Sequence, residues 1–338
     1  MAKRNLKLER LLKDGITRTI LYKDQKVSEL ELELWHTSVF QRLYFIRQLG
    51  FSDKVFPDAV HNRFNHVIGV CQRAEDILVA AAEQTSPKFV PHLADSIKPR
   101  TVSEYILSRI DVGRLMALLH DLAHIPFGHT LEDELHLFAT KHDQHSRQVK
   151  LFNRITSQFI WGLYDDVIGL WPQRWSRDVS SEQLNRHTEE LLELSEKPGS
   201  PNKLLDLGKF LTNLSAAQVA LVTMHHGYEK ATNDQVQLFL PKLLPKLNID
   251  AEFFHPQRDQ FLIDAIGNTI CADLLDYSRR DMRMASMSGD YDDRLFKWFV
   301  LAETSRGTQD VTPGVNVAIP VLFVKRIDPL SANKIAPP

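Results

Sequence analysis

The chain has few cysteines and no long apolar run. Its two cysteines, Cys71 and Cys271, lie far apart and outside any paired motif, which argues against a disulfide framework and for a reducing compartment. No stretch approaches the ~18 apolar residues that a membrane-spanning helix needs. No apolar signal core follows the first seven residues, Met1 to Lys7. We therefore expect a cytoplasmic protein that makes no membrane contact.

The chain also lacks a dominant charge and the glycine-rich loops of several enzyme classes. Its formal net charge is only -2, so no global field draws it to nucleic acid or to a membrane. It contains neither a Gly-x-Gly-x-x-Gly loop nor a Gly-x-x-x-x-Gly-Lys-Ser loop, and it has no serine nucleophile elbow. These absences exclude dehydrogenases, kinases and serine hydrolases that depend on such loops.

The composition is that of a soluble globular protein with a sizeable core. Hydrophobic residues make up 43% and charged residues 25% of the 338 residues. Histidine is unusual, because many of the 14 histidines fall in tight clusters: His61/His66, His120/His124/His129, His136/His142/His145 and His225/His226. Such clustering favours a metal or phosphate site.

Three segments differ in character along the chain. Residues 1–29 form a basic arm, which is either a solvated terminal segment or a contact for a partner subunit or polyanion. Residues 30–295 read as a helical catalytic domain with a helical insertion at about 145–215. Residues 296–338 form a C-terminal segment with strand character, most clearly the β-branched stretch 315–324.

The expected fold class is therefore mostly α, a helical bundle with a small strand-containing C-terminal segment. Asn62 or Asn65 is a candidate cap for one helix, and Pro126 is expected to end another. The periodicity of apolar residues predicts helices over 39–49, 66–84, 103–124, 145–185, 203–228 and 258–286.

His120 and Asp121 follow the apolar run of residues 115–119. Burying an unpaired imidazole or carboxylate costs several kcal/mol, whereas a metal ion satisfies both groups at once. In a helical bundle, metal ligands come from facing helices. Three further segments, 61–66, 124–133 and 273–281, could meet this pair. They complete a candidate set of two histidines and two carboxylates with room for water and substrate: His66, His120, Asp121 and Asp273.

These segments, in this order, resemble the HD-domain phosphohydrolase superfamily. The resemblance is closest to the dNTP triphosphohydrolase branch, which includes sterile-alpha-motif and HD-domain hydrolases and bacterial dGTPase-like relatives. It covers roughly residues 30–145 and 265–285. The matching strings are Phe40–Leu43, Arg47–Gly50, Val55–Pro57, His61–His66, Leu119–Asp121, His124–His129 and Ala272–Asp281.

The resemblance implies a metal and a reaction. One divalent transition metal (Mn, Fe, Ni or Zn) would be held by the four residues above, with Mg²⁺ accompanying the substrate phosphates. His124 and His142 would handle phosphate or protons, and Glu132 would orient a histidine. The reaction implied is attack of water at the α-phosphate of a dNTP, which gives a deoxynucleoside and tripolyphosphate.

The resemblance also implies substrate-binding residues and an assembly. Arg63 would bind phosphate through its planar guanidinium, while His129 would either contact the substrate or make a structural hydrogen bond. The sugar would be lined by Gln48, Leu49, Tyr277 and Asp281. A homo-oligomer is expected, because oligomers are common in this branch.

The chain departs from the branch at several positions. Ala123 and Ile125 stand where glycines are usual, and Ile125 would narrow the phosphate pocket. Tyr44 and Leu274 replace residues that are usually basic. These changes make the nature of the substrate less certain than metal binding.

Other functions remain open at this point. His225 and His226 would hold a second metal in a dinuclear phosphodiesterase, or they are a pair at the end of a helix that bonds backbone carbonyls. A phosphodiesterase or a 5′-nucleotidase would use the same scaffold. In a different class, a nucleotide sensor or nucleic-acid binder without catalysis would fit the basic arm and the missing glycines.

Overall fold

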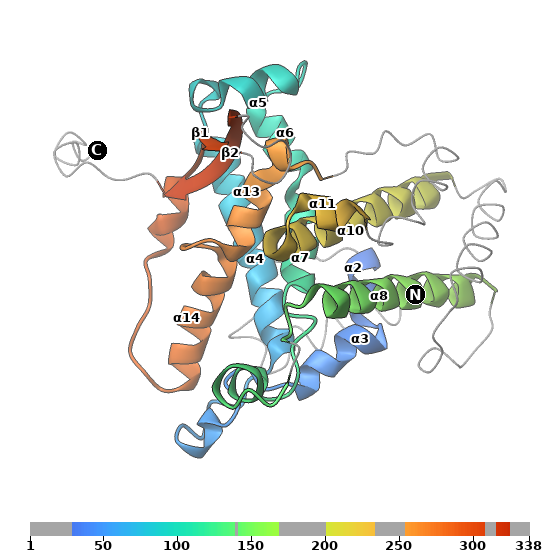
Figure 1. Cartoon of the computed structure of the whole chain (residues 1–338), viewed down its shortest axis with the longest axis vertical. Helices are drawn as coiled ribbons and strands as arrows, with labels where there is room; N and C mark the ends of the chain where they lie inside the picture. The colour runs from blue at the N-terminus through green and yellow to red at the C-terminus, as the bar shows by residue number, and fades with distance from the viewer. Residues whose placement is uncertain (1–28, 139–140, 169–200, 234–253, 308–315, 325–338) are drawn as a thin grey trace.

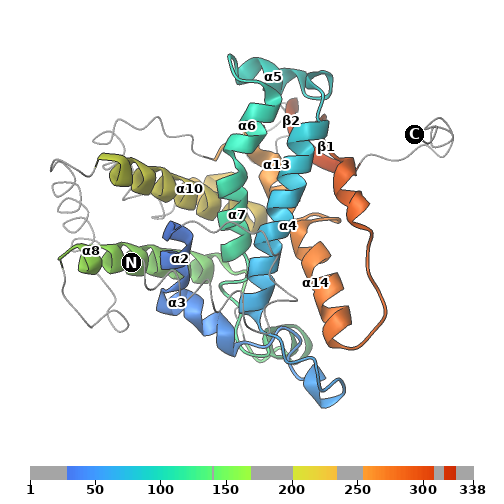
Figure 2. The same ribbon diagram turned by 180° about the vertical axis from the view of Figure 1, so that it is seen from behind.

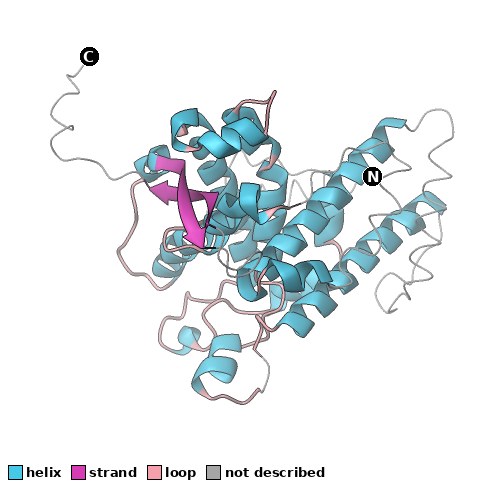
Figure 3. Ribbon diagram, turned by 45° about the horizontal axis from the view of Figure 1, so that its top comes forward, coloured by secondary structure: helices cyan, strands magenta, loops and turns pink. Residues whose placement is uncertain are grey.

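The computed structural model describes residues 29–138, 141–168, 201–233, 254–307 and 316–324. Most of the basic arm and part of the expected helical insertion, residues 169–200, lie outside the described residues. Helices account for most of the described residues, so the expected mostly α fold class is confirmed. Figure 3 shows two strands at one end of the helical assembly.

Helix α4 (Arg63–Gln84) runs through the middle of the molecule (Figure 1). It begins after Asn62, whose side chain accepts a hydrogen bond of 3.1 Å from the backbone N–H of Asn65, so the predicted cap is present. Helices α7 (Ile110–Leu119) and α14 (Ala272–Met284) both pack against α4, and Figure 2 shows the same arrangement from behind. These three helices carry three of the candidate metal ligands.

The helix predicted over 103–124 is wrong in two respects. The structure divides it into α6 (Val102–Ser108) and α7, with the break at Arg109. The guanidinium of Arg109 lies 3.2 Å from the fully buried carboxylate of Asp259, an ion pair between distant parts of the chain. Helix α7 then ends at Leu119, well before Pro126, so His120 is its C-cap and the following residues form a turn.

The helix predicted over 39–49 is also shorter than expected. Helix α2 (Glu29–Trp35) is followed by α3 (Ser38–Gln41) and a 3-10 turn (Arg42–Phe45), after which Ile46 is extended. The backbone N–H of Gln48 donates to the carbonyl of His61 at 3.0 Å, and the N–H of Arg63 donates to Ile46 at 2.8 Å. These bonds hold residues 46–48 against the start of α4.

The remaining helices cover the other side of α7 and the strands. Helix α10 packs on α7 and α8, and α13 packs on strand β2. The helix predicted over 258–286 is interrupted between Gly267 and Ala272, where Asn268 and Cys271 have extended backbones. The stretch 86–101 contains a 3-10 turn (Pro87–Phe89) and α5. The bounds are α5 Pro91–Ser96, α8 His145–Ile168, α10 Pro201–His226, α11 Tyr228–Asn233 and α13 Pro256–Gly267.

Strands β1 (Phe299–Gly307) and β2 (Asn316–Val324) form an antiparallel pair after a 3-10 turn (Asp293–Trp298). The register pairs Phe299 with Val324 at one end and Gly307 with Asn316 at the other. Both strands lie in the segment 296–338 for which we expected strand character, although only the stretch 315–324 was singled out. Within the described ranges, no helix has both the length and the apolar character that crossing a membrane requires.

Candidate metal centre

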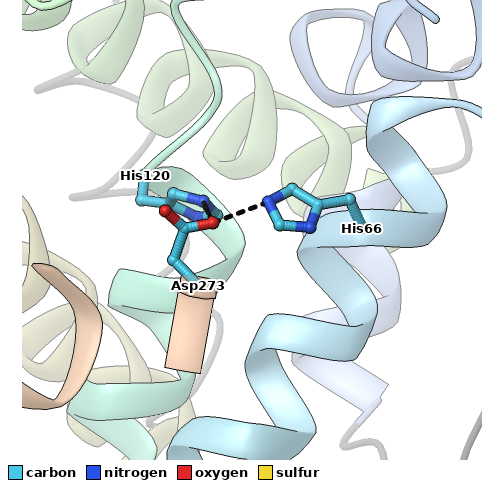
Figure 4. Close-up of side chains that lie close together, drawn as sticks. All are labelled: His66, His120 and Asp273. Atoms are coloured by element: carbon cyan, nitrogen blue, oxygen red, sulfur yellow. Dashed lines mark ion pairs between the residues drawn. The ribbon is translucent and has the colours of Figure 1, made fainter. Parts of the chain in front are cut away.

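His66, His120 and Asp273 converge from three different helices (Figure 4). The Nε2 atom of His66 lies 3.0 Å from Oδ1 of Asp273, and Nε2 of His120 lies 3.7 Å from the same oxygen. The carboxylate of Asp121 lies 3.6 Å from each of these two ring nitrogens. Three of the four predicted ligands, His66, His120 and Asp273, therefore have the spacing of metal ligands, and Asp121 lies beside the two histidines.

The outer sides of both histidine rings are hydrogen-bonded in a way that fixes the ring protons. Nδ1 of His66 lies 2.9 Å from Oδ2 of Asp276, and Nδ1 of His120 lies 2.7 Å from the carbonyl oxygen of Ala117. Carbonyl and ionised carboxylate oxygens only accept, so each Nδ1 donates and each Nε2 is directed to the centre. This is the usual arrangement around metal-ligating histidines.

A buried nitrogen atom of His120 without a hydrogen-bond partner indicates whether these residues fit a cation. In the described part of the chain, Nε2 of His120 is buried and has no hydrogen-bond partner. A buried polar atom without a partner costs about 1–3 kcal/mol. Because this nitrogen faces two carboxylates and a second imidazole, a divalent ion would satisfy all of them, and the residues fit a metal centre.

The electrostatics of the centre favour a cation. Burial would lower the pKa of His66, but hydrogen bonds to Asp273 and Asp276 and the charge of Asp121 raise it to about 10. Burial would raise the pKa of Asp121, but the nearby charge of Arg63 outweighs it and holds this pKa well below its usual range. The carboxylates are thus ionised at neutral pH, and their negative charge attracts a positive ligand.

A second cluster, formed by His124, His142 and Glu132, lies next to the first. Nε2 of His124 is 3.3 Å from Oδ1 of Asp121, so this aspartate contacts both clusters. The rings of His124 and His142 stack with their centroids 3.6 Å apart. The buried carboxylate of Glu132 lies 2.8 Å from Nδ1 of His142 and accepts its backbone N–H at 3.0 Å, a geometry that orients this ring.

Two arginines that the sequence analysis did not select support the second cluster. Arg147 lies 3.0 Å from Oε1 of Glu132. Arg42 donates from Nη1 to the carbonyl of His124 at 2.7 Å and from Nη2 to the carbonyl of Leu122. Arg42 belongs to one of the matching strings, which was a usable signal, whereas no local pattern marked Arg147.

The structure brings some predicted substrate residues together and separates others. Arg63 is buried with its guanidinium on Asp121, so its charge already has a partner. His129 is 61% exposed, pairs with Asp133 at 3.0 Å, and has its ring centroid 5.0 Å from that of His124. Arg63 therefore lies beside the metal centre, and His129 lies at the protein surface near it.

His61, which was part of a matching string but had no assigned role, connects two predicted sugar-lining residues. Its Nε2 lies 2.7 Å from Oδ1 of Asp281, and its carbonyl accepts the N–H of Gln48 at 3.0 Å. Leu49 is half-buried beside Gln48, and Tyr277 is 37% exposed on α14. We call these residues, His61, Gln48, Leu49, Tyr277 and Asp281, the rim residues.

His225 and His226 do not join either cluster. Among the described residues, the groups with the spacing of metal ligands are His66/His120/Asp273 and His124/Glu132/His142. Nε2 of His226 lies 2.7 Å from the backbone carbonyl of Asp143 at the end of α10. The contact of His226 is of the kind expected if these two histidines bond backbone carbonyls.

No protein-family model matches the chain. A putative HD domain-containing protein of Acanthamoeba polyphaga mimivirus is 34% identical over 112 residues, which are 32% of this chain and 23% of that protein. An uncharacterized protein of Mycoplasma pneumoniae is 25% identical over 331 residues, 85% of this chain and 71% of the relative. The deoxynucleoside triphosphate triphosphohydrolase SAMHD1 of Xenopus laevis is 38% identical over 96 residues, 28% of this chain and 13% of that enzyme.

These partial matches support the resemblance to the HD-domain superfamily. Its relatives include enzymes named dNTP triphosphohydrolases from frog, mouse and zebrafish. The matched part spans only 23% of the viral relative and 20% of an uncharacterized protein of Methanocaldococcus jannaschii.

Proposed function

We propose that this chain is a metal-dependent phosphohydrolase that converts dNTPs to deoxynucleoside and tripolyphosphate. The observation that carries the proposal is the buried, unpartnered Nε2 of His120, which faces Nε2 of His66 and the carboxylates of Asp121 and Asp273. An unpartnered buried nitrogen destabilises a structural core, whereas in a hydrolytic metal site it would bind the metal ion. The triphosphohydrolase name of the SAMHD1 relatives supports the choice of substrate.

His66, His120, Asp121 and Asp273 would hold one divalent ion of manganese, iron, nickel or zinc. Such an ion, when bound, supplies an activated water and polarises a phosphoryl oxygen. The choice among these metals depends on availability as much as on the ligands. Mg²⁺ would accompany the phosphates of the substrate.

The second cluster is suited to proton transfer beside the metal centre. Burial lowers the pKa of His124 to about 4, so this ring is neutral at pH 7 and can accept a proton. His142, stacked against it and oriented by Glu132, would exchange protons with the substrate phosphates or the departing oxygen. Arg42 keeps the turn that carries His124 in place.

The rim residues would bind the nucleotide. Gln48, half-buried and bonded through its backbone N–H to the carbonyl of His61, would contact the sugar. The exposed edge of Tyr277 and the carboxylate of Asp281 would contact the sugar, with Leu49 packing beside it. Arg63, held on Asp121, would approach a phosphate oxygen, and the exposed His129 would contact the phosphates.

The test is to incubate the purified chain with each dNTP, each NTP and a cyclic dinucleotide, with Mn²⁺ and Mg²⁺, and to identify the products by mass. Tripolyphosphate together with a deoxynucleoside is the expected result. His120→Ala should abolish turnover. The matched control is His92→Ala, because His92 is exposed on α5 and pairs with Glu303, away from both histidine clusters.

Other products would redirect the assignment. A nucleoside monophosphate or a linear dinucleotide would indicate a 5′-nucleotidase or phosphodiesterase on the same scaffold. Nucleotide binding without any product, with every metal tested, would indicate a sensor. Turnover that survives His120→Ala would overturn the metal-dependent mechanism.

A further inference from the structure

Asp276 is a buried carboxylate on α14, one turn after Asp273, and it contacts the outer side of a candidate metal ligand. Its Oδ2 atom lies 2.9 Å from Nδ1 of His66. Arg280, one turn further along the same helix, donates from Nε to Oδ2 at 2.7 Å and from Nη2 to Oδ1 at 2.6 Å. Both side chains are almost completely buried, so this bidentate pair holds the carboxylate in one orientation.

Gly69 on α4 provides the space for this pair. A Cβ atom at position 69 would overlap Oδ1 of Asp276 and Nη2 of Arg280. A glycine inside a helix costs about 1 kcal/mol relative to alanine. The helix nevertheless has glycine at this position, one turn after His66, where it allows α4 to approach the ion pair closely.

We propose that Asp276, held by Arg280 in the space left by Gly69, is the positioning residue that fixes His66 for metal binding. This inference rests on the proposed metal centre. An ionised carboxylate accepts only, so it places the ring proton on Nδ1 and leaves Nε2 directed at Asp273. Asp276 itself does not face the centre and acts only through His66.

The alternative is a purely structural ion pair. A buried ion pair contributes little net stability, but removal of one partner leaves the other charge buried and destabilises the fold strongly. A single substitution at Asp276 therefore cannot distinguish positioning of His66 from a purely structural ion pair. The double variant Asp276→Asn/Arg280→Met removes both charges together and avoids a stranded guanidinium.

An asparagine at position 276 also tests the tautomer directly. Its amide can present an N–H to Nδ1 of His66, which favours the ring proton on Nε2, where it blocks the metal. Loss of the correct histidine tautomer in this way is the reason that the corresponding substitution impairs the Ser-His-Asp triad. The double variant should thus fold and yet bind metal poorly.

The experiment measures Zn²⁺ affinity by competition with a chromophoric chelator, together with the thermal midpoint of the metal-free protein. Gly69→Ala is a second variant, because it displaces the carboxylate without changing any polar group. Gly113→Ala, on α7, is its matched control, since the nearest atoms to a Cβ there belong to the apolar side chains of Leu78 on α4 and Leu262 on α13. The ¹⁵N spectrum of the zinc-loaded protein reports which nitrogen of His66 carries the proton.

We expect the double variant and Gly69→Ala to bind Zn²⁺ about 10–100-fold more weakly, the usual effect of losing such a hydrogen-bond partner. Gly113→Ala should bind it as the parent does. In the parent, Nδ1 of His66 should carry the proton.

Three outcomes distinguish failure of the proposed metal centre from failure of the inference about Asp276. A parent chain that binds no Zn²⁺ overturns the proposed metal centre and this inference with it. A parent that binds Zn²⁺ while the double variant binds it equally well overturns the inference alone. A fall in affinity that Gly113→Ala shares equally would assign the effect to helix packing and also overturn it.

Discussion

Acidification should destabilise the metal-free protein through His124. This imidazole is 3% exposed, and burial, with smaller contributions from the charges of Arg63 and His142, lowers its pKa from 6.5 to about 4 despite the opposing effect of Asp121. In the unfolded chain the ring takes up a proton near pH 6.5. The unfolded state therefore binds more protons than the folded state between pH 6.5 and about 4, so the stability falls as the pH falls through this window.

The size of the effect follows from the two pKa values. The full separation corresponds to about 3 kcal/mol, which is lost once the pH is below both values. At pH 5 the folded ring is still mostly neutral, whereas the unfolded ring is almost fully protonated. The loss between pH 7.5 and pH 5 is then about 2 kcal/mol, a large part of the ~5–15 kcal/mol typical of a folded domain.

The assay compares urea unfolding of the parent and of His124→Gln in EDTA at pH 7.5 and pH 5. Glutamine does not titrate, so the difference in unfolding free energy between the two proteins isolates His124 from all other groups. That difference should shift by about 2 kcal/mol against the parent at pH 5. The exposed His92, replaced by glutamine in the same way, serves as the control for a histidine outside both clusters.

A pH-independent difference would refute the reasoning, because it would mean that burial does not keep the His124 ring neutral. So would a shift in the parent's favour at pH 5. That result would require the attraction of Asp121 to exceed the cost of burial and to raise the pKa of His124 above 6.5.

Three further predictions concern the fold and the rim. Arg42→Met should cost about 2–4 kcal/mol, because it leaves two backbone carbonyls, those of Leu122 and His124, without a charged donor; faster hydrogen exchange around residues 122–128 would accompany the loss. Tyr277→Phe should raise KM for the nucleotide and leave the melting temperature unchanged, since the ring is 37% exposed; an unchanged KM would remove this residue from the site. Leu118→Ala should cost about 2–5 kcal/mol in urea unfolding, because its side chain is fully buried in the core.

Local signals in the sequence were sufficient where the cause is local. Asn62 caps α4 through the N–H of Asn65, three residues away, and this geometry can be read from the sequence. The break at Arg109 cannot, because the partner of its guanidinium, Asp259, lies 150 residues along the chain.

In the site, too, some residues could be predicted from local sequence patterns and others could not. The four candidate ligands were selected from motif strings, and the structure brings them together, although their roles remain a proposal. Asp276 and Arg280 had a usable signal, since positions 273, 276 and 280 share one face of a helix. Arg42 had a weaker one, because its acceptors are backbone carbonyls some 80 residues away, and no side-chain pattern marks a carbonyl.

The helix ends at Leu119 and Ala272, which the apolar periodicity did not predict, position His120 and Asp273 in the site. His66 lies in the first turn of α4, Asp273 in the first turn of α14, and His120 at the C-cap of α7. Uninterrupted helices over 103–124 and 258–286 would place His120 and Asp273 within helices instead of at helix ends. The break before Ala272 gives α14 a new N-terminus, whose positive end favours the carboxylate of Asp273. A side-chain pattern of period 3.6 carries no information about where such an end falls, so the geometry of this site depends on contacts between distant parts of the chain.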